Sequence, residues 1–399
     1  MSKDYLTLHE KWAADVEACR RGGKVPTSYP QCESCIHMIK GNASHCHKFM
    51  QERKPKYVMF SMRECREFTP VKPLVLEDLS EQEKRVLGGI FGFCIGDMLG
   101  VPVEFCDRQE RDMDPVKELR AYGTYHQPFG TWSDDTSLML CLIDAINSDN
   151  LMQTLRKNMV DFYRSGLFTP GGSVFDIGNS TAQAIARIEA GLPSERCGGR
   201  SDSDNGNGSL MRILPLAFFA DRIQPQELCR LVDQVSGLTH AHPRSRLACI
   251  FYTVMAQKLY GGMSRWDAYD EAVRFVKNHC REGYGQEFGH FKLILSGDIA
   301  ARGRHTIRST GYVVDSLEAA LWAFLRTDSY EAAVMEAVNL GGDTDTIAAI
   351  AGGLGGIYYG FAALPDRLVQ NVRKKEMISD LTLQMYRSNA EAKLGSEQE

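Results

Sequence analysis

Two short acidic segments carry the residues of this chain that are best suited to chemistry. Residues 343–346 read Asp-Thr-Asp-Thr behind Gly341 and Gly342, and residues 133–136 read Ser-Asp-Asp-Thr. Crowded carboxylates repel one another and are costly to bury without partners, so such clusters usually persist by coordinating a hard divalent cation. The four aspartates therefore predict a metal centre, and magnesium is the first expectation.

Helix capping is the simplest alternative explanation. Ser133 stands where an N-cap residue belongs, because an apolar helix is predicted from Leu138, and the helix dipole alone favours acidic residues there. Capping would explain one such segment, but two of the same type favour metal binding. A haloacid-dehalogenase-type phosphatase is a further alternative; its nucleophile motif is Asp-x-Asp-x-Thr, whereas the fifth position here is Ile347.

Helices are predicted around both segments. Apolar residues recur at helical spacing over 138–146 and 347–357, and strand-like alternation is scarce. Glycines stand at positions 88, 92, 96 and 100, and again at 352, 353, 355 and 356. On a helix, glycines at these spacings form a surface without side chains, which lets another backbone approach closely. We therefore expect two glycine-faced helices to meet near the centre of an all-α, many-helix domain.

Composition and charge narrow the class of protein. The chain has 399 residues, 43% of them hydrophobic, which is enough for one large core and a small accessory module. A net charge of −5 gives no overall attraction to nucleic acid or anionic lipid. The apolar run at 86–100 is interrupted by Asp97, so no membrane helix is expected. Twelve cysteines without an apolar signal segment indicate a reducing, cytoplasmic location.

The composition also predicts three regions. Residues 1–78 form a Cys-rich module with a linker, residues 79–390 a catalytic domain, and residues 391–399 a polar tail. Four cysteines of the module, two of them in a Cys-x-x-Cys pair, suit a structural zinc ion, with an iron-sulfur cluster or free thiols as alternatives: Cys32, Cys35, Cys46 and Cys65. Metal would stabilise so small a module, which we expect to recruit a target.

Several motifs occur together in order along the rest of the chain. They are GDMLGVPVEF at 96–105, GTWSDDT at 130–136, GNGSLMR at 206–212, Thr-His at 239–240, GYVVDSLEAALW at 311–322 and GGDTDT at 341–346. The ordered set closely resembles the ADP-ribosylglycohydrolase family, which includes the dinitrogenase reductase-activating glycohydrolase and ADP-ribosylarginine hydrolases.

The resemblance implies an orthogonal α-helical fold that holds two magnesium ions, with manganese as the alternative. The metal ligands it implies are Ser133, Asp134, Asp135, Asp343, Asp345 and Thr346. Ser133 replaces the threonine usual in the family, but its hydroxyl offers the same oxygen. The catalytic carboxylates it implies are Asp343 and Asp345 with Glu104, and their division of labour stays open. The substrate-binding residues it implies are Gly206, Asn207, Gly208, Ser209, Met211 and His240. We add Tyr312, whose flat aromatic ring suits stacking on adenine, with an ordinary core tyrosine as the alternative.

The resulting hypothesis is a magnesium-dependent hydrolase that cleaves the glycosidic bond between ADP-ribose and an acceptor, reversing ADP-ribosylation. Two magnesium ions would coordinate the ribose hydroxyls and orient a water molecule, while a carboxylate transfers the proton. Arginine, serine, nucleic acid and small metabolites all stay open as acceptors. A catalytically inactive ADP-ribose-binding relative is the alternative function.

Overall fold

A computed structural model describes residues 78–219 and 223–396. The four cysteines predicted to bind metal in the Cys-rich module lie outside the described residues. The described segments are helical; their extended pairing is limited to three isolated bridges, and they form no β-sheet. The prediction of an all-α fold is therefore confirmed.

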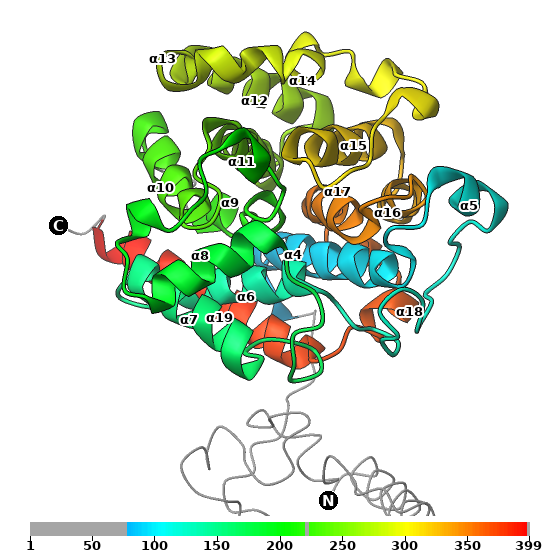
Figure 1. Cartoon of the computed structure of the whole chain (residues 1–399), viewed down its shortest axis with the longest axis horizontal. Helices are drawn as coiled ribbons and strands as arrows, with labels where there is room; N and C mark the ends of the chain where they lie inside the picture. Colours follow the sequence, from blue (N-terminus) through cyan, green and yellow to red (C-terminus); the bar gives the residue numbers. More distant parts are fainter. Residues whose placement is uncertain (1–77, 220–222, 397–399) are drawn as a thin grey trace, which may run out of the picture. The chain divides into compact units, whose positions relative to one another are not determined.

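The helices of the described residues are numbered as in Figure 1. Their bounds are α4 Glu81–Gly100, α5 Arg108–Met113, α6 Asp134–Ile146, α7 Leu151–Ser165, α8 Asn179–Glu189, α9 Leu216–Phe219, α10 Pro225–Gly237, α11 Pro243–Tyr260, α12 Arg265–His279, α13 Arg281–Tyr284, α14 Lys292–Ser296, α15 Val313–Arg326, α16 Tyr330–Val338, α17 Thr344–Tyr359, α18 Asp366–Val369 and α19 Lys375–Ser396.

Helices α4 and α17 cross at the centre of the domain, in blue and orange in Figure 1. A Cβ atom at Gly92 would lie 2.4 Å from the carbonyl oxygen of Gly352, and one at Gly96 would lie 2.1 Å from that of Ala348. Only glycine permits this approach, and the predicted meeting of two glycine-faced helices is confirmed. The helices run antiparallel, so the end of α4 lies against the start of α17.

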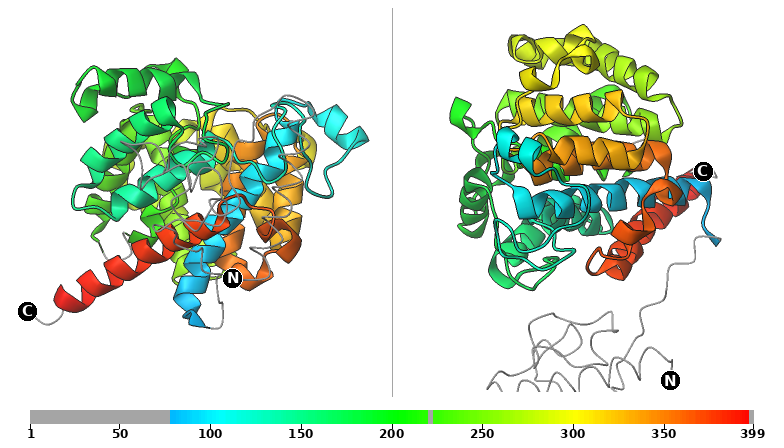
Figure 2. Two further views of the ribbon diagram at one scale, coloured as in Figure 1. Left: turned by 90° about the horizontal axis from the view of Figure 1, so that it is seen from below. Right: turned by 90° about the vertical axis from the view of Figure 1, so that its right-hand side faces the viewer.

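The remaining helices pack around this crossing. Helices α11, α15 and α16 contact α17, while α6 and α19 contact α4; Figure 2 shows α19, in red, beside α4. Helices α7 and α8 extend the α6 side, and α12 covers α11. Most side chains between these layers are apolar, and Trp132 and Trp322 are among the largest that are fully buried. The site is therefore carried by a rigid, continuous core.

The segment Glu81–Val103 is long and apolar enough to cross a membrane by length and composition. Its most apolar window is nevertheless 100% buried inside the protein, by the helices that surround α4. The central position of this helix in the core explains its composition without a membrane.

The crossing gives a direct test of packing. We expect Gly96→Ala to destabilise the protein by about 2 kcal/mol, because the added methyl group forces two backbones apart. Gly283→Ala is the matched control, since a Cβ atom there has no neighbour within 4 Å. Urea unfolding followed by circular dichroism measures both changes; equal stability of the two variants would contradict the close crossing.

Candidate metal and catalytic centre

The Gly341-Gly342 pair sets the Asp-Thr-Asp-Thr segment in place. Both glycines have positive φ, +73° and +75°, which side-chain-bearing residues rarely adopt. A Cβ atom at Gly342 would lie 2.1 Å from the carbonyl oxygen of Ser309. Main-chain bonds pair Gly342 with Phe105 and Cys106, at 2.8 Å each, so the start of α17 is fixed beside Glu104.

Asp97, at the end of α4, holds the Ser-Asp-Asp-Thr segment. Its fully buried carboxylate accepts hydrogen bonds from the main-chain N–H groups of Ser133 and Thr136 and from the Thr136 hydroxyl, at 2.7–3.0 Å. Burial raises the pKa of Asp97 to about 6, although these bonds act in the opposite direction. From sequence, Asp97 is recognisable as the residue that interrupts an apolar run and as part of the 96–105 motif; its position three residues before the end of α4 does not reveal this role.

The two acidic segments meet. Each of Glu104, Asp343 and Asp345 offers one carboxylate oxygen within 4.8 Å of the others, which is close enough to share one cation. Asp135 interacts with the Thr346 side chain, and this contact joins the 133–136 segment to the 343–346 segment. Of the six predicted metal ligands, Asp343 and Asp345 therefore share this carboxylate group with Glu104, while Asp135 and Thr346 link the start of α6 to that of α17. Ser133 and Asp134 adjoin Asp135 at the start of α6.

Burial and mutual repulsion disfavour the charged forms of these groups. The pKa of Asp135 is raised well above its usual value by burial and then by Asp97, Asp134 and Asp343. The pKa of Asp345 is raised by burial, Glu104 and Asp135. Burial raises the pKa of Glu104 to about 8, with further contributions from Asp343 and Asp176. Such a cluster needs a compensating positive charge to stay ionised.

The donor set fits a hard divalent cation. Three buried carboxylate oxygens have no hydrogen-bond partner: Glu104 Oε2, Asp135 Oδ2 and Asp343 Oδ1. None of the ion pairs found among the described residues involves these carboxylates. Asp343 is the N-cap of α17, yet its side chain makes no capping bond, so capping does not explain it. Carboxylate and hydroxyl oxygens are the ligands that magnesium, calcium and manganese prefer.

A further carboxylate borders this centre. Asp176, in the loop between α7 and α8, adds to the repulsion felt by Glu104 and Asp134. The Tyr125 hydroxyl interacts with both Asp176 and Glu104 and favours their charged forms. Sequence reasoning missed Asp176 and Tyr125, because neither stands in a recognisable motif.

The predicted substrate-binding loop forms the opposite wall. The Asn207 amide donates to Asp343 Oδ2 at 2.7 Å and to the Ser316 hydroxyl at 2.9 Å, so it links the loop to the acidic centre. Gly206 forms an antiparallel bridge with Tyr312, and the Asn207 N–H donates to the Gly311 carbonyl at 3.0 Å. These bonds hold the loop against the start of α15.

Two buried side chains support the same loop from behind. Arg212, with no exposed surface, donates to the Gly208 and Val235 carbonyls at 2.6 and 2.8 Å. His240 is buried, and burial lowers its pKa to about 3, which keeps the imidazole neutral. A Cβ atom at Gly208 would lie 2.7 Å from the His240 ring, so this histidine lies directly beneath the loop.

The structure also places the other predicted contacts. Ser209 is fully buried, and its hydroxyl accepts a hydrogen bond from Ser236 at 2.9 Å, while Met211 is 4% exposed. Both lie in the interior behind the loop. Tyr312 is the N-cap of α15 and stays half-buried at the outer edge of this wall.

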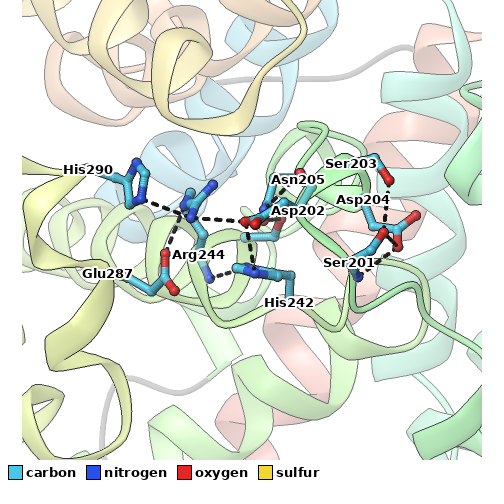
Figure 3. A network of polar contacts seen from close by, with 10 residues as sticks. Ser201, Asp202, Ser203, Asp204, Asn205, His242, Arg244, Glu287 and His290 are labelled. Carbon is cyan, nitrogen blue, oxygen red and sulfur yellow. Dashed lines mark hydrogen bonds and ion pairs between the residues drawn. The ribbon is translucent and has the colours of Figure 1, made fainter.

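A polar network around Arg244 lies beside Tyr312; Figure 3 shows Arg244 with Glu287, His290 and Asp202. The guanidinium donates to Glu287 at 2.8 Å and to Asp202 at 3.3 Å, and it lies 2.9 Å from His290 Nε2. It also stands 5.9 Å from the centre of the Tyr312 ring. Because Arg244 is buried at 8% exposure, these contacts fix one side of the ring. Arg244 is not among the substrate-binding residues predicted from sequence.

Comparison with known proteins identifies the family to which this chain belongs. The family profile described as ADP-ribosylglycohydrolase matches residues 78–394. This chain belongs to the ADP-ribosylglycohydrolase family. The members of the family are glycosidic-bond hydrolases, and the resemblance drawn from the ordered motifs is confirmed.

Individual relatives agree with this assignment. An ADP-ribosylarginine hydrolase of Serratia proteamaculans is 33% identical over 310 residues, covering 77% of this chain and 80% of the relative. The ADP-ribosyl-[dinitrogen reductase] glycohydrolase of Rhodospirillum rubrum is 28% identical over 284 residues, covering 70% and 87%. A solved chain of an ADP-ribosylglycohydrolase-related protein complex aligns with a TM-score of 0.61 at 27% identity, covering 78% of this chain and 100% of its own.

The role of Asp97 in this ADP-ribosylglycohydrolase can be tested by one substitution. Asp97→Asn replaces an acceptor oxygen with an NH2 group that cannot receive a main-chain N–H, so the 133–136 segment loses part of its support. We expect magnesium affinity, measured by titration calorimetry, to fall about 10- to 100-fold with helix content unchanged. Asp161→Asn, which removes an exposed ion pair on α7, is the control; unchanged magnesium affinity in Asp97→Asn would contradict the positioning role.

Proposed function

We propose that this ADP-ribosylglycohydrolase is a magnesium-dependent enzyme that releases ADP-ribose from arginine side chains of proteins. The observation that carries the proposal is the convergence of two acidic segments on three buried carboxylate oxygens without partners. Every predicted ligand position keeps an oxygen donor, which favours an active enzyme over an inactive ADP-ribose-binding relative.

Two magnesium ions fit the proposed ligand set of Ser133, Asp134, Asp135, Asp343, Asp345 and Thr346. When bound, they supply charge stabilisation and orient both the ribose hydroxyls and an attacking water. The protein holds these ligands rigidly. Asp97 anchors the 133–136 segment, and the glycine crossing of α4 and α17 anchors the 343–346 segment. A fixed site of this kind costs little reorganisation during reaction.

The reaction breaks the bond between the anomeric carbon and the guanidine nitrogen. Water adds to that carbon, its proton passes to a carboxylate, and the leaving guanidine takes up a proton. Glu104, Asp343 and Asp345 are the carboxylates within reach of one another for this proton transfer. The Asn207 amide donates to Asp343 Oδ2 and so leaves the partnerless Oδ1 available for this chemistry.

Two neighbouring carboxylates at the centre, Asp176 and Glu104, favour an arginine acceptor. Asp176 and Glu104 face the same Tyr125 hydroxyl, and neither forms an ion pair found among the described residues. A guanidinium, planar and cationic, is the side chain best matched to two neighbouring carboxylates. The relative from Serratia proteamaculans carries the name ADP-ribosylarginine hydrolase, which agrees with this choice.

Asp343→Asn tests the metal-dependent mechanism. We expect turnover of an arginine-ADP-ribosylated protein to fall about a thousandfold, since several kcal/mol of charge stabilisation depend on this ligand. Release of ADP-ribose, followed by liquid chromatography, measures the change, and circular dichroism checks the fold. The wild-type enzyme should lose activity in chelator and regain it with magnesium. Full turnover in chelator, or a phosphoenzyme trapped at Asp343, would refute the mechanism.

Asp176→Asn tests the acceptor class. We expect kcat/KM for an arginine-ADP-ribosylated peptide to fall about 10- to 100-fold, the usual cost of losing a charged hydrogen bond. The affinity for free ADP-ribose should stay the same, because the acceptor is absent from that ligand. Asp149→Asn, at an exposed position after α6, is the control. Equal losses on arginine- and serine-linked peptides would argue against arginine recognition by Asp176.

A further inference from the structure

Exposed large apolar side chains concentrate in the segment that follows Glu104. Residues 105–129 hold four of them, Phe105, Met113, Tyr122 and Phe129, exposed by 69%, 78%, 62% and 55%. The other four found among the described residues are scattered over α7, α12, the turn before α12, and α17. Scattered apolar side chains are ordinary on a surface, but a local concentration of this kind marks an interaction site.

The backbone holds two of these rings outward in a strained conformation. Phe105 and Tyr122 have φ of +65° and +69°, and His126, between Tyr122 and Phe129, has +54°. Bulky side chains are unfavourable in this left-handed region, so such outliers cluster at functional sites. Main-chain bonds enforce the strain: Phe105 N–H donates to Gly342, and Tyr122 N–H pairs with Gln127.

The same segment is tied to the proposed catalytic carboxylate. Phe105 directly follows Glu104, and the Thr124 hydroxyl donates to the Glu104 carbonyl at 2.7 Å. A Cβ atom at Gly123 would lie 1.7 Å from the Pro102 carbonyl oxygen, so the 122–127 turn packs directly on the 102–104 segment. The Tyr125 ring lies between those of Phe105 and Phe175, with centroids 6.4 and 5.2 Å away.

These rings border the acceptor side of the centre. We call Phe105, Tyr122, Tyr125 and Phe175 the aromatic rim. The Tyr125 hydroxyl interacts with Glu104 and Asp176, the two carboxylates assigned above to the acceptor guanidinium. The ADP-ribose wall comes from different segments, 205–208 and 311–312. A free arginine acceptor ends at the carboxylates, whereas an arginine in a protein continues into the polypeptide around it.

We propose that the aromatic rim is a docking surface for the polypeptide that surrounds the modified arginine of a protein substrate. This inference rests on the proposed function and goes beyond it, because it separates protein substrates from free ADP-ribosylarginine. Rigid aromatic rings suit the role, since they cover a large area and lose little conformational freedom on docking. The rim thereby contributes to substrate affinity without touching the reacting atoms.

The test compares two substrates of the full-length enzyme: a protein ADP-ribosylated on arginine, and free ADP-ribosylarginine. For Phe105→Ala and Tyr122→Ala we expect kcat/KM on the protein to fall about tenfold through KM. On free ADP-ribosylarginine, both variants should stay within about twofold of wild type. Tyr163→Ala, an exposed aromatic on α7, should change neither value.

Three outcomes would overturn the proposal. Equal losses on both substrates would mean that the rim supports Glu104 structurally; Tyr122→Ala guards against this ambiguity, because Tyr122 is 62% exposed. Unchanged kinetics on the protein would mean that no docking occurs. A change in oligomeric state by light scattering, with both kinetics intact, would assign the rim to a second copy of the chain.

Failure of the proposed function is distinguishable from failure of the rim. Wild-type enzyme that releases ADP-ribose from neither substrate refutes the proposed function. In that case, the aromatic rim is tested by measuring how tightly each of the two substrates binds to the Asp343→Asn enzyme. The ADP-ribosylated protein should bind about tenfold more tightly than free ADP-ribosylarginine, and Tyr122→Ala should remove that difference. Equal affinity for the two would refute the rim.

Discussion

Repulsion among buried carboxylates is the constraint on which this structure depends. Asp134, Asp135 and Asp345 are nearly inaccessible to water, and burial and their neighbours raise their pKa values. A flexible protein would relieve this repulsion by moving the two acidic segments apart. The segments stay together because each is bonded to the core through its own backbone, so the repulsion is left for a cation to neutralise.

The glycine crossing explains why the segments cannot separate. Gly100 packs so tightly that a Cβ atom there would lie 2.3 Å from the Cα atom of Asp345, and Thr344 donates to the Gly100 carbonyl at 2.9 Å. Asp97, one turn earlier on α4, bonds the other segment. One turn of α4 therefore positions both halves of the centre, and contact between two backbones leaves little side-chain freedom to loosen it.

Sequence reasoning succeeded where the signal was local. Helical periodicity, the glycine spacing and the acidic motifs predicted the all-α fold and the α4 and α17 pair. It failed where a role depends on distant partners. Asp97 acts through groups 36 and 39 residues away, and Asp176 matters only because Tyr125 and Glu104 lie beside it. A buried carboxylate and an exposed loop carboxylate look alike in sequence; packing alone distinguishes them.

The two surfaces proposed to bind substrate differ in how firmly they are built, and this difference bears on specificity. The loop proposed to bind ADP-ribose is held by a bridge between Gly206 and Tyr312 and by the buried Arg212. The proposed acceptor surface consists of loops that carry exposed rings, where sequence change costs little stability. Acceptor preference could therefore change independently of the hydrolytic centre, except at Glu104. That residue belongs both to the acidic centre and to the proposed acceptor surface, because its carboxylate lies close to Asp343 while its backbone leads directly into the strained Phe105. Any change of acceptor must preserve this junction.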